Sequence, residues 1–190
     1  MLGILEICNN SLLSCQIYYI ILSLVNIVYL FDFICIDGRD AIVFWSIHGY
    51  LVPTKKIVKK DLTGKKSTIK FTIRDSQESF VYFGKSHQEI EDHLMYLKNK
   101  KECIQPFIMC VGEDISRITD IYVYFDDVKY SFNSFLRAVD ILFKIFHIFN
   151  LSFPAESSMF WNFIESNFFE IKSNNSFSKV HVLIENLKAA

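Results

Sequence analysis

The sequence predicts an α+β fold, in which a small antiparallel sheet carries one packed helix and is followed by a C-terminal cluster of three helices. Three patterns indicate this. Short apolar runs lie between turn residues in the middle of the chain, polar residues recur at helical spacing near its end, and a charge-free apolar stretch lies near its start. We therefore expect an apolar N-terminal segment with a helix, residues 1–40, and a single α+β domain, residues 41–190, whose part 131–190 is helical.

The composition fits a chain that buries a sizeable core. Of its 190 residues, 51% are hydrophobic, and twelve of the nineteen phenylalanines lie between Phe125 and Phe177. The net charge of −1 indicates no general attraction to nucleic acid or to an acidic partner. The five cysteines are odd in number and irregularly spaced, which favours reduced thiols, and therefore an intracellular protein, over a disulfide framework.

The N-terminal segment contains 21 consecutive residues without a charge, 11–31. A helix of this length would cross the roughly 30 Å core of a bilayer, and the lysines that follow would keep its C-terminal side in the cytoplasm. Gln16, Asn26 and several serines and tyrosines make it less apolar than a leucine-rich span. Three alternatives stay open: a membrane anchor, an element buried in a soluble fold, and a start that does not belong to the protein.

Short β-like runs follow the N-terminal segment. The clearest is 67–74, where apolar residues alternate with polar ones, a pattern typical of a half-buried strand. The polar DSQE segment behind it predicts a turn, so 67–83 should form a β-hairpin with 79–83 as its second strand. The other expected strands are 41–47, 107–111, 121–125 and 128–130.

One helix is expected among these strands. Ser86 precedes Glu89 by three positions, the spacing of a capping box, in which each side chain accepts a hydrogen bond from a backbone N–H of the first turn. This predicts a helix over 87–100, with apolar residues on one face that can pack on the sheet.

A Phe-rich helical hairpin is expected over 132–170. In its first helix, 133–150, the polar residues fall three and four positions apart and form one stripe: Arg137, Asp140, Lys144 and His147. Nearly all other positions are apolar, so this helix needs neighbours on most of its surface. A second helix over 155–170 and a last helix over 177–188 complete the three-helix cluster.

The segment Tyr124-Phe125-Asp126-Asp127 is similar to the Y-x-D-D box of reverse transcriptases, where two carboxylates at a strand turn hold divalent metal ions. Such an enzyme also needs a third carboxylate on an earlier strand and a palm that holds a primer-template. The short upstream region supplies neither. Because aspartate is an ordinary turn residue, we interpret Asp126 and Asp127 as a turn.

Two other polar clusters also have structural explanations. The histidine and cysteine spacings match no standard zinc motif; the residues are His87, His93, Cys103 and Cys110. The polar stripe of 133–150 is explained by exposed salt bridges, with Asp140 and Lys144 in the favourable i,i+4 order. No nucleotide-binding, serine-hydrolase or zinc-protease motif occurs. We therefore predict no catalytic, cofactor-binding or metal-binding residue, and no enzyme.

The candidate contact residues are six lysines of the segment KKIVKKDLTGKK: Lys55, Lys56, Lys59, Lys60, Lys65 and Lys66. Lysine side chains can bind the phosphates of nucleic acid or of anionic lipid. The alternative is a solvated loop, because the segment lacks the interleaved aromatic residues of a single-strand binder.

Residues 121–171 resemble the C-terminal portion of a family of uncharacterised animal proteins. The shared pattern is a helix with an AVDxxFKxF core, then an FN…FP loop, then WxFI. Here it consists of Ala138, Val139, Asp140, Phe143, Lys144 and Phe146, then Phe149, Asn150, Phe153 and Pro154, then Trp161, Phe163 and Ile164. The resemblance covers roughly a quarter of the chain and implies an association with mobile elements, but it brings no activity or site residues.

We expect an intracellular, non-enzymatic interaction or scaffold protein, because every candidate site has a structural explanation. One alternative is a nucleic-acid-associated protein of mobile-element origin that uses the lysines. The other is a single-pass membrane protein anchored through 11–31. The partner would be another protein on the Phe-rich helical face, or nucleic acid or an anionic membrane on the lysines.

Overall fold

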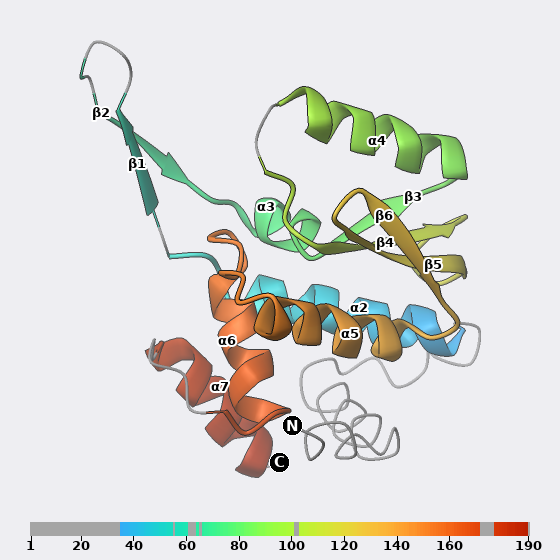
Figure 1. Cartoon of the computed structure of the whole chain (residues 1–190). Coiled ribbons are helices and arrows are strands. Elements are labelled where there is room, and N and C mark those ends of the chain that lie inside the picture. The colour runs from blue at the N-terminus through green and yellow to red at the C-terminus, as the bar shows by residue number, and fades with distance from the viewer. Residues whose placement is uncertain are drawn as a thin grey trace.

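A four-stranded sheet with helices on both faces forms the centre of the molecule (Figure 1). The computed structural model describes residues 35–54, 56–60, 64, 66–100, 103–171 and 177–189. The fold is α+β, as the sequence predicts. Its helices are α2 (Ile36–Tyr50), α3 (Ile73–Glu78), α4 (His87–Asn99), α5 (Phe135–Ile148), α6 (Ser158–Asn167) and α7 (Ser178–Ala189). Its strands are β1 (Lys56–Lys60), β2 (Lys66–Lys70), β3 (Val81–Gly84), β4 (Phe107–Gly112), β5 (Ile118–Phe125) and β6 (Val128–Phe132).

The main sheet has the order β3-β4-β5-β6 and is mixed. Strands β4, β5 and β6 pair antiparallel, as predicted, whereas β3 pairs parallel with β4. A parallel pair needs a crossover of about a dozen residues or more, and α4 supplies it between β3 and β4. Figure 1 shows α4 on one face of the sheet and α2 with α5 on the other. Strand β4 is therefore buried on both faces.

The segment 41–47, predicted as a strand, lies in helix α2. Its buried residues recur at the three- and four-residue spacing of a helix face: Ala41, Phe44, Ile47 and, just past the helix end, Leu51. Periodicity alone does not separate so short an apolar run from a buried strand, which is why the prediction was wrong. The expected domain boundary at residue 40 also falls inside α2, which packs beside α5.

The predicted hairpin over 67–83 does not form. Residues 66–70 pair instead with 56–60, and the described residues of that strand are exposed rather than half-buried. The DSQE segment belongs to α3, because Thr72 and Asp75 form a capping box in which each side chain accepts a backbone N–H of the other. This local bonding starts a helix where composition alone suggested a turn.

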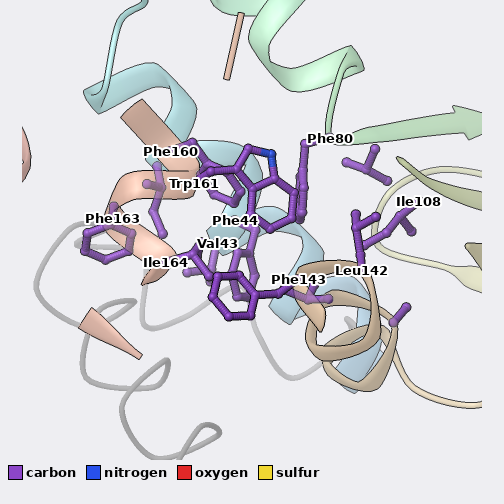
Figure 2. Close-up of a cluster of buried hydrophobic side chains, with 14 of the residues drawn as sticks. Val43, Phe44, Phe80, Ile108, Leu142, Phe143, Phe160, Trp161, Phe163 and Ile164 are labelled. Carbon is purple, nitrogen blue, oxygen red and sulfur yellow. The ribbon is translucent and has the colours of Figure 1, made fainter. Parts of the chain in front are cut away.

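The predicted C-terminal helices are confirmed as α5, α6 and α7. The predicted helix behind Ser86 is confirmed as α4, although Glu89 accepts from the N–H of Lys85 rather than that of Ser86. Figure 2 shows how α5 and α6 bury their aromatic side chains with those of α2 and of the turn before β3. Phe44 meets Phe80 at 5.9 Å and Phe160 at 6.0 Å between ring centroids. Helix α2 thus covers the side of α5 that the sheet and α6 leave open.

The apolar segment 11–31 and its predicted helix lie outside the described residues. Among the residues that are described, no helix combines the length and the apolar character that crossing a bilayer requires.

Candidate functional site

The predicted contact lysines belong to a β-hairpin formed by β1 and β2, which projects from the rest of the molecule (Figure 1). Thr54, just before β1, donates a hydrogen bond to the sulfur of Met159 in α6 at 3.5 Å and ties the base of the hairpin to the helices. The hairpin is therefore a defined element rather than a loop.

The register of the hairpin brings lysines together across the two strands. Lys56 pairs with Lys70, and Lys60 pairs with Lys66. The side chains of Lys56, Lys66 and Lys70 are exposed, and no ion-pair partner contacts them within the described part of the chain. Residues directly opposite each other in an antiparallel pair share a face, so like charges meet there.

Not all of the predicted lysines can be placed. Lys56, Lys59 and Lys60 lie in β1 and Lys66 in β2, whereas Lys55 and Lys65 lie outside the described residues. Lys70 is a further lysine of the hairpin that was not among the predicted contact residues. Its signal was the alternation of residues 66–70, which sets Lys70 on the same face as Lys66.

A groove of about 490 Å³ lies at the base of the hairpin. Its walls are the end of β2 with Phe71, helix α3, the C-terminal half of α4, the segment 103–107 and the loop before α6. The side chains that line it include Ile69, Glu78, Tyr96, Lys100, Gln105 and Glu156. No local sequence pattern predicts this groove, because its walls come from segments far apart in the chain.

Several polar groups of the groove are already engaged. Asp75 accepts hydrogen bonds from the backbone N–H and the hydroxyl of Thr72 at 2.7 and 2.8 Å. Glu78 pairs with Arg74 at 2.7 Å. Ser79 donates to the carbonyl of Ser76 at 2.9 Å. These groups are thus bonded within the protein itself.

Three polar groups of the groove are free to meet a ligand. The half-buried Glu156 carboxylate and the exposed Gln105 amide have no hydrogen-bond or ion-pair partner among the described residues. The Lys100 ammonium lies 4.3 Å from the ring centroid of Tyr96, a cation–π contact. Tyr96 is 56% exposed, so its ring is open to a ligand.

His93 also lines the groove but acts as a packed ring. It stacks on Tyr82 with centroids 3.6 Å apart and an interplanar angle of 6°. Burial lowers the pKa of His93 below its usual value of 6.5, so the imidazole is neutral at physiological pH. It offers the groove an aromatic surface rather than a positive charge.

Asp126 and Asp127 form the predicted turn, between β5 and β6. Both have positive φ angles, 51° and 60°, the left-handed conformation of a tight hairpin turn. Asp127 accepts a hydrogen bond from the Tyr124 hydroxyl at 2.7 Å and pairs with Lys98 at 2.8 Å. These contacts hold the pKa of Asp127 below its usual range, with Lys98 the larger cause. The Asp127 carboxylate thus ties the turn to α4.

The candidate zinc ligands do not gather in one place. Cys110 is buried in β4 on the α2 side of the sheet, whereas His93 packs on the α4 side. His87 lies near Asp120, with 3.6 Å between Nε2 and Oδ2. Within the described ranges, no three histidine, cysteine, aspartate or glutamate residues are grouped so that they could hold a metal ion.

The polar stripe of α5 forms salt bridges, although Asp140 and Lys144 are half-buried rather than exposed as predicted. Lys144 and Asp140 are 2.7 Å apart, and His147 lies 3.8 Å from Glu165 of α6. Arg137 is exposed. Through His147 and Glu165, the stripe links α5 to α6.

A buried pair of a serine and a histidine escaped the sequence analysis. The Ser76 hydroxyl lies 2.8 Å from Nδ1 of His48, and the imidazole stacks on Phe160 with centroids 3.9 Å apart. Burial lowers the pKa of His48 to about 3. Both side chains are at most 1% exposed, so no substrate reaches them, and the pair joins α2 to α3 as a core contact. The two residues are 28 positions apart, and no spacing rule connects them.

Comparison with known proteins yields no match to this chain, whether with protein-family models, curated proteins or solved structures. The resemblance of residues 121–171 to a family of animal proteins stays a prediction.

Proposed function

We propose that this protein is a non-enzymatic interaction protein whose β1–β2 hairpin binds the phosphates of nucleic acid. The observation that carries the proposal is the register, which sets Lys56 opposite Lys70 and Lys60 opposite Lys66. Directly opposed like charges destabilise a strand pair, and an isolated two-stranded hairpin is itself marginal. A polyanion along the hairpin would replace this repulsion with attraction, because each neutralised phosphate also releases a counterion.

The shape of the hairpin supports a nucleic-acid partner. The major groove of DNA admits a two-stranded β-ribbon, and the hairpin stands clear of the sheet and helices, so a nucleic acid can approach without meeting them (Figure 1). The overall charge of −1 makes the attraction local to the hairpin.

The state of the other candidate groups supports binding without catalysis. The Asp127 carboxylate is committed to Tyr124 and Lys98, and the His48–Ser76 pair is sealed in the core. Lys56, Lys66 and Lys70 of the hairpin, in contrast, are exposed and unpaired within the described part of the chain. We assign the contact with the partner to the hairpin for this reason.

The test is the affinity of the full chain for fluorescent DNA and RNA, single-stranded and duplex, measured by anisotropy at low salt. The triple variant Lys56→Gln, Lys66→Gln, Lys70→Gln should bind every oligonucleotide at least tenfold more weakly. The matched control removes the same charge from exposed lysines elsewhere, in Lys85→Gln, Lys179→Gln, Lys188→Gln, and should bind like the wild type. Equal affinity of both triple variants would contradict the proposal.

A second arm uses vesicles of neutral lipid with and without an anionic lipid. Lysines also attract anionic membrane surfaces, so both partners must be tested on the same variants. Hairpin-dependent binding to anionic vesicles without binding to any oligonucleotide would overturn the assignment of the partner.

A further inference from the structure

The groove lies at the base of the hairpin that carries the lysines. Ile69 near the end of β2 and Phe71 just after it line the groove, whereas Lys70 between them lies on the lysine face of the hairpin. The volume of the groove, about 490 Å³, lies within the range of small-molecule sites. A chain of phosphates bound along β1 and β2 would therefore pass the mouth of a cavity large enough for one nucleotide.

The free groups of the groove define what it would recognise. Glu156 offers a carboxylate that accepts hydrogen bonds, and Lys100 offers an ammonium that binds an anion or an acceptor. Tyr96 offers a largely exposed ring on which a flat group can stack. The matching ligand has a flat aromatic part, hydrogen-bond donors at its edge and an anionic group nearby.

A nucleotide has these three features together. Among the bases, guanine carries N1–H and the 2-amino group side by side, so one carboxylate can accept both hydrogens, as it does from an arginine fork. Uracil and thymine flank their single N–H with two carbonyl oxygens, which a carboxylate repels. Bases inside a duplex are stacked and paired, so only an unpaired nucleotide can enter.

We propose that the groove binds one unpaired nucleotide of a single-stranded nucleic acid, with guanine preferred. The base stacks against Tyr96 and donates hydrogen bonds to Glu156, while Lys100 faces a phosphate. This inference rests on the proposed function, because the hairpin supplies most of the attraction to the strand. The hairpin gives affinity without sequence preference, and the groove adds the preference for a base.

The test compares a short thymidine oligonucleotide with the same oligonucleotide carrying one central guanine. The wild type should bind the guanine-containing strand about tenfold more tightly. Tyr96→Ala should weaken that binding about tenfold, and Glu156→Gln should remove the preference while leaving the affinity for thymidine unchanged. The control Met95→Ala changes a 63% exposed neighbour on α4 that does not line the groove, and should have no effect.

A second measurement separates this inference from the proposed function. Guanosine monophosphate alone, added to the isotope-labelled full chain, should shift the NMR signals of Tyr96 and Gln105, and should not do so in Glu156→Gln. If all strands bound tightly and depended on the hairpin lysines, with no guanine preference and no such shifts, nucleotide binding in the groove would be refuted and phosphate binding by the hairpin would stand. If the wild type bound no oligonucleotide at all, both the hairpin and the groove proposals would be refuted. Binding of a cationic arginine peptide in place of the nucleotide would also overturn the groove assignment, because the peptide would then be the partner of the Glu156 carboxylate.

Discussion

Lys56 lies directly opposite Lys70 across the β1–β2 hairpin, and neither has an acidic partner within the described residues. An opposed lysine pair costs a strand pair free energy of folding. The Lys56–Lys70 pair is thus unfavourable for the stability of the hairpin and favourable for the binding of an anion.

The first prediction exchanges one charge of this pair. Lys70→Glu should leave the free energy of unfolding unchanged or raise it by up to about 1 kcal/mol, because opposite charges then meet across the strands. The same change should weaken nucleic-acid binding by more than tenfold. Urea unfolding and anisotropy measure the two effects. Lys179→Glu, at an exposed position of α7, is the control and should leave the binding unchanged. If Lys70→Glu lowered the free energy of unfolding and the affinity together, the weaker binding would follow from a less stable hairpin, and the prediction would be wrong.

The second prediction tests helix α2, which the sequence analysis assigned to a strand. A Cβ on Gly38 would lie 2.7 Å from the backbone carbonyl oxygen of Ser116, so Gly38→Ala should lower the free energy of unfolding by about 1–3 kcal/mol. Gly49 lies in the same helix, and beyond its neighbouring residues and the adjacent helix backbone no atom lies within 4 Å of such a Cβ. Gly49→Ala should raise the free energy of unfolding by about 0.8–1 kcal/mol, as alanine does in a helix. A loss of stability in Gly49→Ala would mean that the segment is not helical.

The third prediction concerns the pH dependence that His48 contributes. Burial lowers its pKa in the folded state to about 3, against 6.5 in the unfolded chain, so the unfolded chain binds the proton first as the pH falls. The contribution of neutral His48 is therefore fully present above about pH 6.5 and is lost below it, by about 1.4 kcal/mol per pH unit. Urea unfolding at pH 5 and 7 should show this loss of unfolding free energy in the wild type. In His48→Phe, which lacks this one proton-binding group, the loss should be smaller by up to about 1.4 kcal/mol per pH unit. Identical slopes in the two proteins would show that His48 is not buried as described.

The fourth prediction has the opposite sign and concerns Asp40 in α2. Burial, with the nearby Asp37 carboxylate, raises its pKa to about 7 from 3.8. The stability that protonated Asp40 contributes is present at low pH and is lost as the pH rises toward and through 7. Asp40→Asn, which keeps the shape without the charge, should therefore gain stability relative to the wild type between pH 5 and pH 8. A constant difference between the two proteins over this range would contradict the raised pKa.

Elements whose sequence carries a local signal could be predicted. Helix α4 follows a cap at Ser86, helix α5 shows one polar stripe, and β4 and β5 are apolar runs between turns. Helix α2 could not be assigned, because a short buried helix and a buried strand use the same apolar residues. The partner of β2 could not be assigned either, because alternation identifies a strand without naming the strand that pairs with it.

The candidate site divides in the same way. Within the described residues, β1 and β2 contain four of the predicted lysines, since clustered charge is visible in the sequence. The opposed pairing of Lys56 and Lys70, the groove and the His48–Ser76 contact all depend on tertiary packing between distant segments. No local pattern encodes them.

The most direct test of nucleic-acid binding by the hairpin is the salt dependence of that binding. The logarithm of the association constant should fall linearly with the logarithm of the salt concentration. For duplex DNA, the magnitude of this slope should be smaller by about two to three in the variant Lys56→Gln, Lys66→Gln, Lys70→Gln than in the wild type, because three phosphate contacts are lost. An unchanged slope in this variant would show that these lysines do not contact phosphates and would contradict the assignment.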